Sequence, residues 1–224
     1  RDSSTSRGLG DVYKRQNDYF ATNIKVKNGG VDFTVNIKNK GSYDARLNVL
    51  GEHNVRNALV AIAVAERHGI EVTEAIKALA GYEGVSMRQQ ITDVNGVTII
   101  DDSYNASPDS MKAGIDVLCD YNNNGRKIAV LADMLELGDK SADYHKEVGG
   151  YMAEKKIDEL ILFGTMAANI GDGFNGSYKL FKKREEINEY LLKNLKSGDA
   201  ILFKGSRGMK LNECVDFLKE NYNG

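Results

Sequence analysis

Apolar and polar residues alternate in short runs after the first part of the chain. The apolar positions 20, 24 and 26 precede an Asn-Gly-Gly tripeptide at 28–30, and positions 31, 33, 35 and 37 follow it. A period of two around an Asn-Gly pair is typical of a β-hairpin. A further short strand is expected over residues 43–50.

The hydrophobic period changes from two to between three and four after Gly51. Val55, Leu59 and Ile62 lie on one face of a helix at this spacing, and Gly69 has the position of its C-terminal stop. Thr73 is expected to cap a second helix that ends near residue 81. Gly-rich sequence then predicts a domain boundary near residue 84, so that residues 17–84 form a first domain and residues 85–224 a second.

Strands and helices alternate through the second domain. Strands are expected at 97–100, 127–132, 160–163, 178–181 and 200–204, and helices at 109–120, 141–155, 185–195 and 211–221. Alternation at this spacing indicates a mostly parallel sheet covered by helices, with right-handed crossovers. The fold class is therefore α/β, a Rossmann-like C-terminal domain preceded by a β-hairpin and two helices.

Composition narrows the function classes. Hydrophobic residues make up 42% and charged residues 28%, and the net charge of −2 argues against a nucleic-acid partner. No apolar run approaches the roughly 20 residues of a membrane helix. Cys119 and Cys214 are expected to be buried thiols of a reducing compartment, and the three histidines lack metal-ligand spacing.

The first sixteen residues fit nothing that follows them. They are polar, rich in Ser, Arg and Gly, and without hydrophobic period, so we expect disorder. Their character is that of translated linker sequence rather than native protein, and a native flexible arm is the alternative.

The most informative stretch is residues 99–112. An apolar strand ends in Asp101 and Asp102, a polar loop follows, and Ser107 and Pro108 have the N-cap and first-turn positions of a helix. Ligands of α/β sheets bind beside such strand–loop–helix turns, where acids can accept sugar hydroxyls. The alternative is a capped loop that only joins two elements.

The string DDSYNASPDSM within this stretch resembles the DDSYNANPDSM signature of the Mur ligases. Three more blocks match that family in order: GEHNVRNALVAIAVA at 51–65, VLADMLELGDKSADYH at 130–145 and KGSRGM at 204–209. The resemblance runs from about residue 17 to the end of the chain. Ser107 stands where the family usually has Asn, and Ala132 where it usually has Gly.

The resemblance implies an ATP-dependent ligase that forms an amide through an acyl phosphate in peptidoglycan precursor synthesis. Among its members, the chain resembles the ligase that adds D-alanyl-D-alanine to UDP-N-acetylmuramoyl-tripeptide, which implies these two small-molecule substrates, a cytoplasmic location and a monomer. No G-x-x-x-x-G-K-[ST] phosphate loop occurs in the sequence. Residues 17–84 therefore look like the C-terminal remnant of the central ATP-binding domain, and the magnesium ligands are expected upstream.

A chain without the phosphate loop is expected to be inactive alone. The rival hypothesis is a stand-alone nucleotide- or dipeptide-binding module without catalysis.

By resemblance, Arg88 reaches the γ-phosphate. An arginine suits this role because its guanidinium binds phosphate oxygens bidentately. A surface salt bridge at the hinge is the alternative. Asp102 is expected to accept both vicinal ribose hydroxyls, and Asp101 to point toward the sheet or cap the loop. Tyr104 and Asn105 pack beside the nucleotide or, equally, hold the loop by hydrogen bonds.

In the family, the segment that contains His53, Asn54 and Asn57 faces the adenine. We expect Asn57 to bind the base, because an amide offers both a donor and an acceptor, and Asn54 to cap the helix. Burial of His53 is the alternative.

Two further loops follow predicted strands. Asp133, Glu136 and His145 belong to one, and the helical His145 either bonds back to the Glu136 loop, shaping the dipeptide pocket, or is only structural. The other contains Lys204, Ser206 and Arg207, a basic loop suited to the carboxylate of D-Ala-D-Ala or an anionic intermediate. A solvated basic loop is the alternative reading of this segment.

Overall fold

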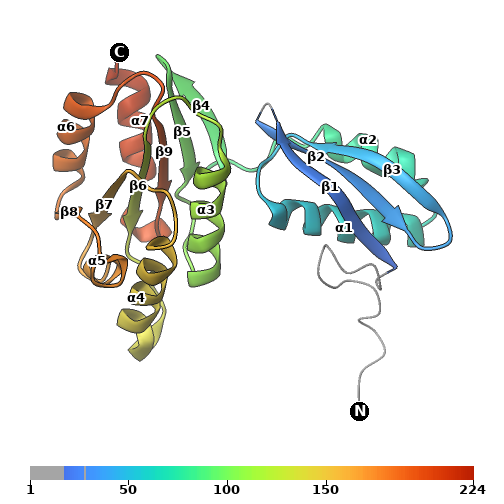
Figure 1. Cartoon of the computed structure of the whole chain (residues 1–224), viewed down its shortest axis with the longest axis horizontal. Coiled ribbons are helices and arrows are strands. Elements are labelled where there is room, and N and C mark those ends of the chain that lie inside the picture. The colour runs from blue at the N-terminus through green and yellow to red at the C-terminus, as the bar shows by residue number, and fades with distance from the viewer. Residues whose placement is uncertain (1–17, 28) are drawn as a thin grey trace. The chain divides into compact units, whose positions relative to one another are not determined.

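A computed structural model describes residues 18–27 and 29–224 (Figure 1). The predicted disorder of residues 1–16 falls outside this range. The chain divides into two compact units, the first ending at Gly84 and the second beginning at Val85.

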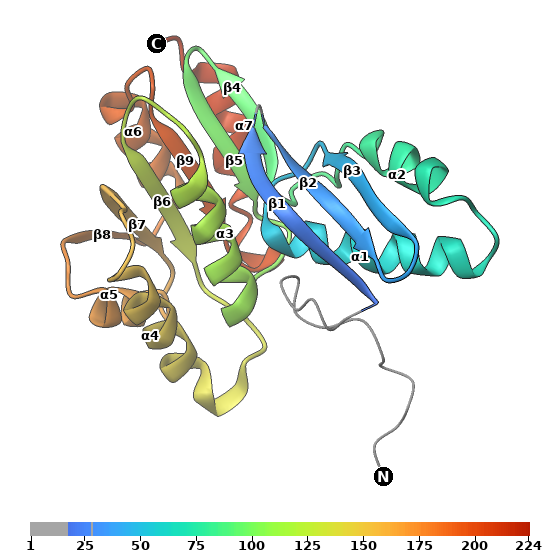
Figure 2. The same ribbon diagram turned by 45° about the vertical axis from the view of Figure 1, so that its right-hand side comes forward.

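The first unit contains a three-stranded antiparallel sheet in the order β1-β2-β3. Its strands are β1 (Tyr19–Lys27), β2 (Gly30–Ile37) and β3 (Gly41–Leu47). Alternate β2 residues are buried, as the period of two requires, so the predicted hairpin and third strand are confirmed. Both helices of this unit pack on one side of the three strands (Figure 2).

Those helices are α1 (Glu52–Arg67) and α2 (Val72–Ala80). Gly51 precedes α1 and Gly69 follows its end, and both have a positive φ. Glycine adopts this backbone conformation more readily than other residues, which suits it to the turn at each end of the helix. The prediction that Thr73 caps α2 is wrong. The N-cap is Glu71, two residues before Thr73, and its backbone is extended, so that the helix begins at Val72.

The second unit is built on a six-stranded sheet in the order β4-β5-β9-β6-β7-β8. Its strands are β4 (Gln90–Val94), β5 (Val97–Asp102), β6 (Lys127–Ala132), β7 (Glu159–Phe163), β8 (Tyr178–Phe181) and β9 (Ala200–Lys204). β5 to β9 run parallel, as predicted, and β4 pairs antiparallel with β5. β4 was not predicted from the sequence, although the turn before β5 is an Asn95-Gly96 pair with positive φ at both residues.

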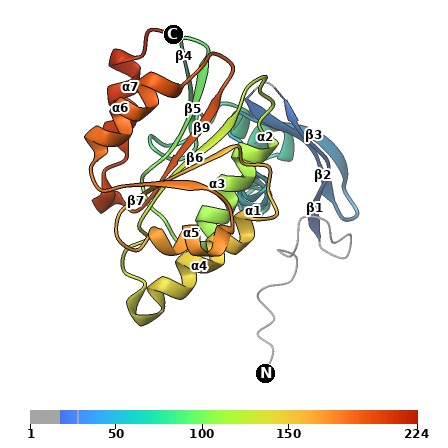
Figure 3. The same cartoon turned by 60° about the vertical axis from the view of Figure 1, so that its left-hand side comes forward.

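Helices cover both faces of this sheet (Figure 3). They are α3 (Pro108–Asp120), α4 (Ser141–Met152), α5 (Ala168–Phe174), α6 (Arg184–Asn194) and α7 (Asn212–Asn221), with short 3-10 turns at Gly138–Lys140 and Arg207–Met209. α6 and α7 cover one face, and α3, α4 and α5 cover the other. The doubly wound α/β prediction is confirmed, and the short α5 is an addition to it.

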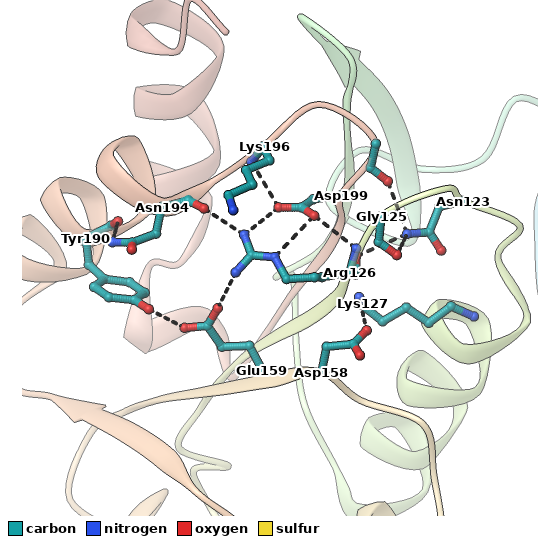
Figure 4. Close-up of polar contacts among 11 residues, drawn as sticks. Asn123, Gly125, Arg126, Lys127, Asp158, Glu159, Tyr190, Asn194, Lys196 and Asp199 are labelled. Atoms are coloured by element: carbon teal, nitrogen blue, oxygen red, sulfur yellow. Dashed lines mark hydrogen bonds and ion pairs between the residues drawn. The ribbon is translucent and has the colours of Figure 1, made fainter.

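A polar network ties together the amino ends of three strands (Figure 4). The Arg126 guanidinium donates to Asp199 Oδ2 at 2.6 Å, to Glu159 Oε2 at 3.1 Å and to the Asn194 carbonyl at 2.6 Å. The Tyr190 hydroxyl donates to the same Glu159 carboxylate. Because Arg126 immediately precedes β6, Asp199 precedes β9 and Glu159 begins β7, the network fixes the edge of the sheet opposite to the predicted ligand edge.

Both cysteines are free thiols, Cys119 half-buried and Cys214 buried. Burial raises the pKa of the Cys214 thiol to about 12, which keeps it protonated and unreactive. Every helix within residues 18–27 and 29–224 is too short or too polar to cross a bilayer.

Candidate functional site

The carboxyl ends of β5 and β9 lie side by side in the second unit. The two strands are parallel neighbours, and their last residues, Asp102 and Lys204, are partners in the register. β9 also pairs with β6, whose end leads into the 133–138 loop. Three of the sequence blocks singled out above therefore meet at one edge of the sheet.

The turn from β5 into α3 forms as predicted. Ser107 is the N-cap and Pro108 opens the helix, while Ser107 and Ser110 exchange hydrogen bonds in a capping box. Asp101 Oδ1 accepts from the Ser103 amide at 3.1 Å and from its hydroxyl at 2.5 Å. Of the alternatives for Asp101, the loop cap is the one observed.

Lys204 requires a correction. Its side chain is 2% exposed, and its ammonium donates to Asp102 Oδ2 at 2.6 Å. The sequence predicts that Lys204 meets the carboxylate of D-Ala-D-Ala or an anionic intermediate, but the structure pairs it with a carboxylate of the protein. Side chains alternate between the two faces of a strand. Phe203 therefore packs on one face of the sheet, and the next residue, Lys204, points to the other face, which α3 covers.

Asp102 is itself buried, with a side-chain exposure of 10%. Burial raises the pKa of its carboxyl above the usual range, and the nearby Lys204 ammonium and Gln89 amide counteract that rise. Contact of Asp102 with a ribose stays a prediction, and Oδ2 is already engaged.

Asn105 holds the loop through two contacts. Its side-chain Oδ1 accepts from the Ala106 amide at 2.8 Å, and its backbone carbonyl accepts from Lys204 Nζ at 3.2 Å. These are the loop-holding bonds of the alternative reading, and a contact of Asn105 with nucleotide stays a prediction.

Arg88 is exposed and stacks on Tyr104, with the guanidinium carbon 4.5 Å from the ring centroid. The Tyr104 amide donates to the Met87 carbonyl at 3.0 Å, which ties the loop after β5 to the segment before β4. Met87 and Gln89, on either side of Arg88, both have positive φ, an unfavourable conformation for residues with side chains. Arg88 forms no ion pair with any carboxylate in the described part of the chain, so the hinge salt bridge is not observed there.

Arg207 lies in the 3-10 turn after β9 and is exposed. Its Nη1 is 3.0 Å from Asn212 Oδ1 and 2.8 Å from the sulfur of Met87. Arg207 therefore contacts the residue that directly precedes Arg88. The structure brings together the two arginines that the sequence assigned to different ligands.

Buried polar groups fix the loop after β6. His145 is fully buried, its Nε2 accepting from the Met134 amide at 2.9 Å and its Nδ1 donating to the Ser141 carbonyl at 2.7 Å. His145 therefore bonds back to the loop after β6, which is the first of the two alternatives given for it above. Ser206 Oγ accepts from the Leu135 amide at 2.8 Å, which joins this loop to the one after β9.

Asp133 holds the next loop along the sheet. Its carboxylate accepts from the Ala167 amide at 2.7 Å and the Thr165 amide at 3.2 Å. Lys204 and Ser206 are buried, so the reading of a solvated basic loop at 204–207 is wrong for these two residues.

Three candidate residues lie in the first unit, at the start of α1. The prediction that Asn54 caps the helix is wrong, because Gly51 is the N-cap and Asn54 Nδ2 instead donates to the Leu50 carbonyl at 2.7 Å. His53 is half-buried with its ring against Gly51, and Asn57 is exposed. Binding of adenine by His53 and Asn57 stays a prediction.

Gly114 of α3 was not singled out from the sequence, although the neighbouring side chains leave no room for a Cβ at this position. A Cβ there would lie 2.9 Å from Lys204 Cδ and 3.2 Å from Asp102 Oδ2. Glycine inside a helix is unfavourable, and that is the sequence signal that marks such a position. No group of three or more His, Cys, Asp or Glu side chains suited to a metal occurs among the described residues.

Two family profiles match the chain. The one described as "Mur ligase, glutamate ligase domain" matches residues 87–207, and the one described as "Mur ligase middle domain" matches residues 9–65. The first covers more than half of the chain, so the match extends well beyond a single motif.

Curated relatives agree. The chain is 38% identical over 215 residues to the UDP-N-acetylmuramoyl-tripeptide--D-alanyl-D-alanine ligase of Bacillus subtilis, covering 92% of this chain and 46% of that protein. The ligase of the same name from Haemophilus influenzae is 34% identical, with 93% and 46% covered. The chain thus spans less than half the length of these relatives.

Solved structures show the same fold. A crystal structure of MurF from Acinetobacter baumannii superimposes with a TM-score of 0.83 at 31% identity, covering 91% of this chain and 45% of that one. The MurF ligase from Thermotoga maritima in complex with ADP gives a TM-score of 0.80 at 24% identity, covering 92% and 47%. At that lower identity the likeness is one of fold alone.

Proposed function

This chain belongs to the Mur ligase family, and we propose that it forms the C-terminal part of an ATP-dependent ligase that adds D-alanyl-D-alanine to UDP-N-acetylmuramoyl-tripeptide. The proposal draws on relatives that bear this name and of which the chain covers 46%. It concerns the whole protein, to which the chain would contribute the last domain and the end of the preceding one.

One observation of the structure carries the proposal. Met87 is contacted by Arg207 and by the Tyr104 amide of the loop after β5, and Arg88, the next residue, stacks on the Tyr104 ring at the carboxyl edge of the parallel strands. Two exposed guanidinium groups at such an edge suit a reaction in which a carboxylate is phosphorylated and a second carboxylate must be held nearby.

Amide formation through an acyl phosphate requires positioning and neutralisation of charge around the transferred phosphoryl group. In the proposed scheme Arg88 binds the γ-phosphate, and its stacking on Tyr104 limits where the guanidinium points. Asp102 accepts a ribose hydroxyl. Arg207 binds the free carboxylate of D-Ala-D-Ala. The amine of this dipeptide attacks the acyl phosphate, and inorganic phosphate is released as the amide forms.

His53 and Asn57 of the first unit are proposed to face the adenine. Magnesium is also proposed for the whole protein, because ATP reacts as its magnesium complex, but the described residues offer no ligand set that fits the ion. Its ligands and the phosphate loop would come from the rest of the ligase. We further propose that the whole protein acts in the cytoplasm, where ATP and nucleotide-linked sugars are made, as a monomer.

The experiment is a comparison of the chain with a completed protein. The chain is fused to the upstream part of the B. subtilis relative and assayed for phosphate release with ATP, magnesium, the tripeptide substrate and D-Ala-D-Ala. Release that depends on all three substrates supports the proposal. A folded fusion that binds nucleotide or dipeptide but never forms the amide would favour the stand-alone binding module.

A further inference from the structure

Lys204 is unusual because a lysine ammonium is rarely buried. Its side chain is 2% exposed at the end of β9, in a sheet whose neighbouring positions are apolar. Removing an ammonium from water is costly unless a counter-ion and further acceptors replace the lost hydration. Asp102 supplies the counter-ion at 2.6 Å, and the Asn105 carbonyl supplies a second acceptor at 3.2 Å.

The two acceptors belong to consecutive parts of one motif. Asp102 ends β5, and Asn105 lies in the loop that follows it. The Lys204 ammonium thus links the end of β5 to the loop that follows it. This contact joins the 99–112 and 204–209 blocks through one buried ion pair.

The helix after the loop provides the space for this pair. Gly114 of α3 lies against both members, and a Cβ at this position would approach Lys204 Cδ to 2.9 Å and Asp102 Oδ2 to 3.2 Å. A buried lysine cannot swing away into solvent to relieve such a contact. A glycine in the middle of α3 is therefore explained by the ion pair beside it.

The pair also reaches the segment before β4. The backbone amide of Gln89 is hydrogen-bonded to the Asp102 carboxyl. Gln89 has a positive φ of 52° and directly follows Arg88. A fixed Asp102 therefore helps to hold the strained backbone that presents the Arg88 guanidinium.

We propose that Lys204 is a positioning residue of the ligase: its buried ammonium orients the Asp102 carboxylate and the loop to Asn105, and Gly114 makes room for the pair. Lys204 then contacts no substrate, and the dipeptide carboxylate is bound by Arg207 alone. The coupling of Lys204, Asp102 and Gly114 stands on the structure by itself. Only its effect on nucleotide binding rests on the proposed function.

The first test uses the 224-residue chain and measures unfolding by denaturant between pH 5 and pH 8. The variants are Lys204→Met, Asp102→Asn and the double variant, with Lys127→Met as the control for losing a lysine elsewhere in the sheet. In Lys204→Met, Asp102 loses the ammonium and keeps the Gln89 amide and the like-charged Asp101, so its folded-state pKa rises further. A carboxyl whose pKa is raised by folding loses stabilisation as pH rises from its unfolded value toward its folded one.

We therefore expect the folding equilibrium constant of Lys204→Met to fall at least tenfold more than that of the wild type between pH 5 and pH 8, since each pKa unit corresponds to a factor of ten. The double variant should recover most of this loss, because neither member of the buried pair then carries a charge. Losses that simply add in the double variant, or a Lys204→Met profile parallel to that of Lys127→Met, would overturn the coupling.

The second test compares two helical glycines. A Cβ at Gly150 of α4 meets nothing within 4 Å, whereas one at Gly114 meets the ion pair. Gly150→Ala should leave the midpoint of unfolding unchanged or raise it, and Gly114→Ala should lower it. Addition of Lys204→Met should lower the midpoint of unfolding less in Gly114→Ala than in the wild type. Equal effects of alanine at both glycines would contradict the assigned role of Gly114.

The third test uses the completed ligase. Lys204→Met should raise the KM for ATP about tenfold with little change in the KM for D-Ala-D-Ala, and Lys204→Arg, which keeps the charge, should restore part of the ATP affinity. A rise confined to the KM for D-Ala-D-Ala would show that Lys204 contacts the dipeptide. A completed wild type without ligase activity would refute the proposed function but leave the first two tests decisive for the coupling.

Discussion

The guanidinium of Arg88 lies over the ring of Tyr104, with its central carbon 4.5 Å from the ring centroid. Both side chains are exposed, so a stacked guanidinium keeps its N–H donors available at its edge. Tyr104 is itself held through its amide by the Met87 carbonyl. The arginine expected to bind phosphate is thus oriented by the loop that is expected to bind the nucleotide.

Replacement of Arg88 tests the phosphate contact. In the completed ligase, Arg88→Ala should lower kcat about 100-fold, or on the order of 3 kcal/mol of barrier, because the charge of the transferring group is no longer neutralised. Adenosine binding should change little. Arg67→Ala, which removes another exposed arginine, is the control. A kcat within threefold of wild type would show that Arg88 is a surface residue.

Asp102 can be tested with altered nucleotides. Asp102→Ala should raise the KM for ATP more than Asp102→Asn, since a lost hydrogen bond to a charged group is worth roughly 1.5–3 kcal/mol. The wild type should lose affinity for 2′-deoxy-ATP, and Asp102→Ala should lose much less. Equal losses in both proteins would place Asp102 away from the 2′-hydroxyl.

Arg207 is expected to govern the dipeptide. Arg207→Ala in the completed ligase should raise the KM for D-Ala-D-Ala and leave that for ATP nearly unchanged, because a paired carboxylate is lost. D-Ala-D-alaninamide lacks that charge, so it should be a poor substrate of the wild type and suffer little further from the mutation. Because Arg207 also lies against Met87 beside Arg88, a change in the ATP constant alone would assign it to the nucleotide instead.

The network at the amino ends of the strands predicts a pH dependence of stability in the chain itself. Burial acts to raise the pKa of Asp199, but hydrogen bonds from Arg126 and the Lys196 amide outweigh it and hold the pKa below the usual value. A lowered folded-state pKa stabilises the protein above the unfolded pKa, and this contribution is lost as pH falls below about 4.

Asp199→Asn should therefore destabilise the chain at pH 7 by about 2 kcal/mol, less than for a fully buried pair because Arg126 is one-third exposed. The difference from the wild type should shrink between pH 4 and pH 2 in denaturant unfolding. A difference that stays constant over this range would mean that the Asp199 charge does not contribute.

The strands and helices of the second unit were largely predictable, because their apolar periods and the Ser107-Pro108 start signal are local in sequence. β4 was missed since five residues with mixed burial carry little pattern, although its Asn95-Gly96 turn offered a signal. α5 is short and contains glycines, which disguise a helix.

The candidate site was predictable only as a set of residues at one sheet edge. The sequence places Lys204 after a strand, but its direction depends on the strand's register against β5 and on the space left by Gly114. The contact of Arg207 with Met87 joins residues 120 positions apart. Such long-range relationships come from the packing of the folded chain and not from a local pattern.

The most direct test of the proposed function is ATP-dependent amide formation by the chain with and without the upstream part of a relative. Phosphate release and the UDP-N-acetylmuramoyl-pentapeptide product are measured together. We expect both products from the completed protein, and neither from the chain alone, since its sequence contains no phosphate loop. Robust turnover by the chain alone, or a folded completed protein that forms no pentapeptide, would contradict the account.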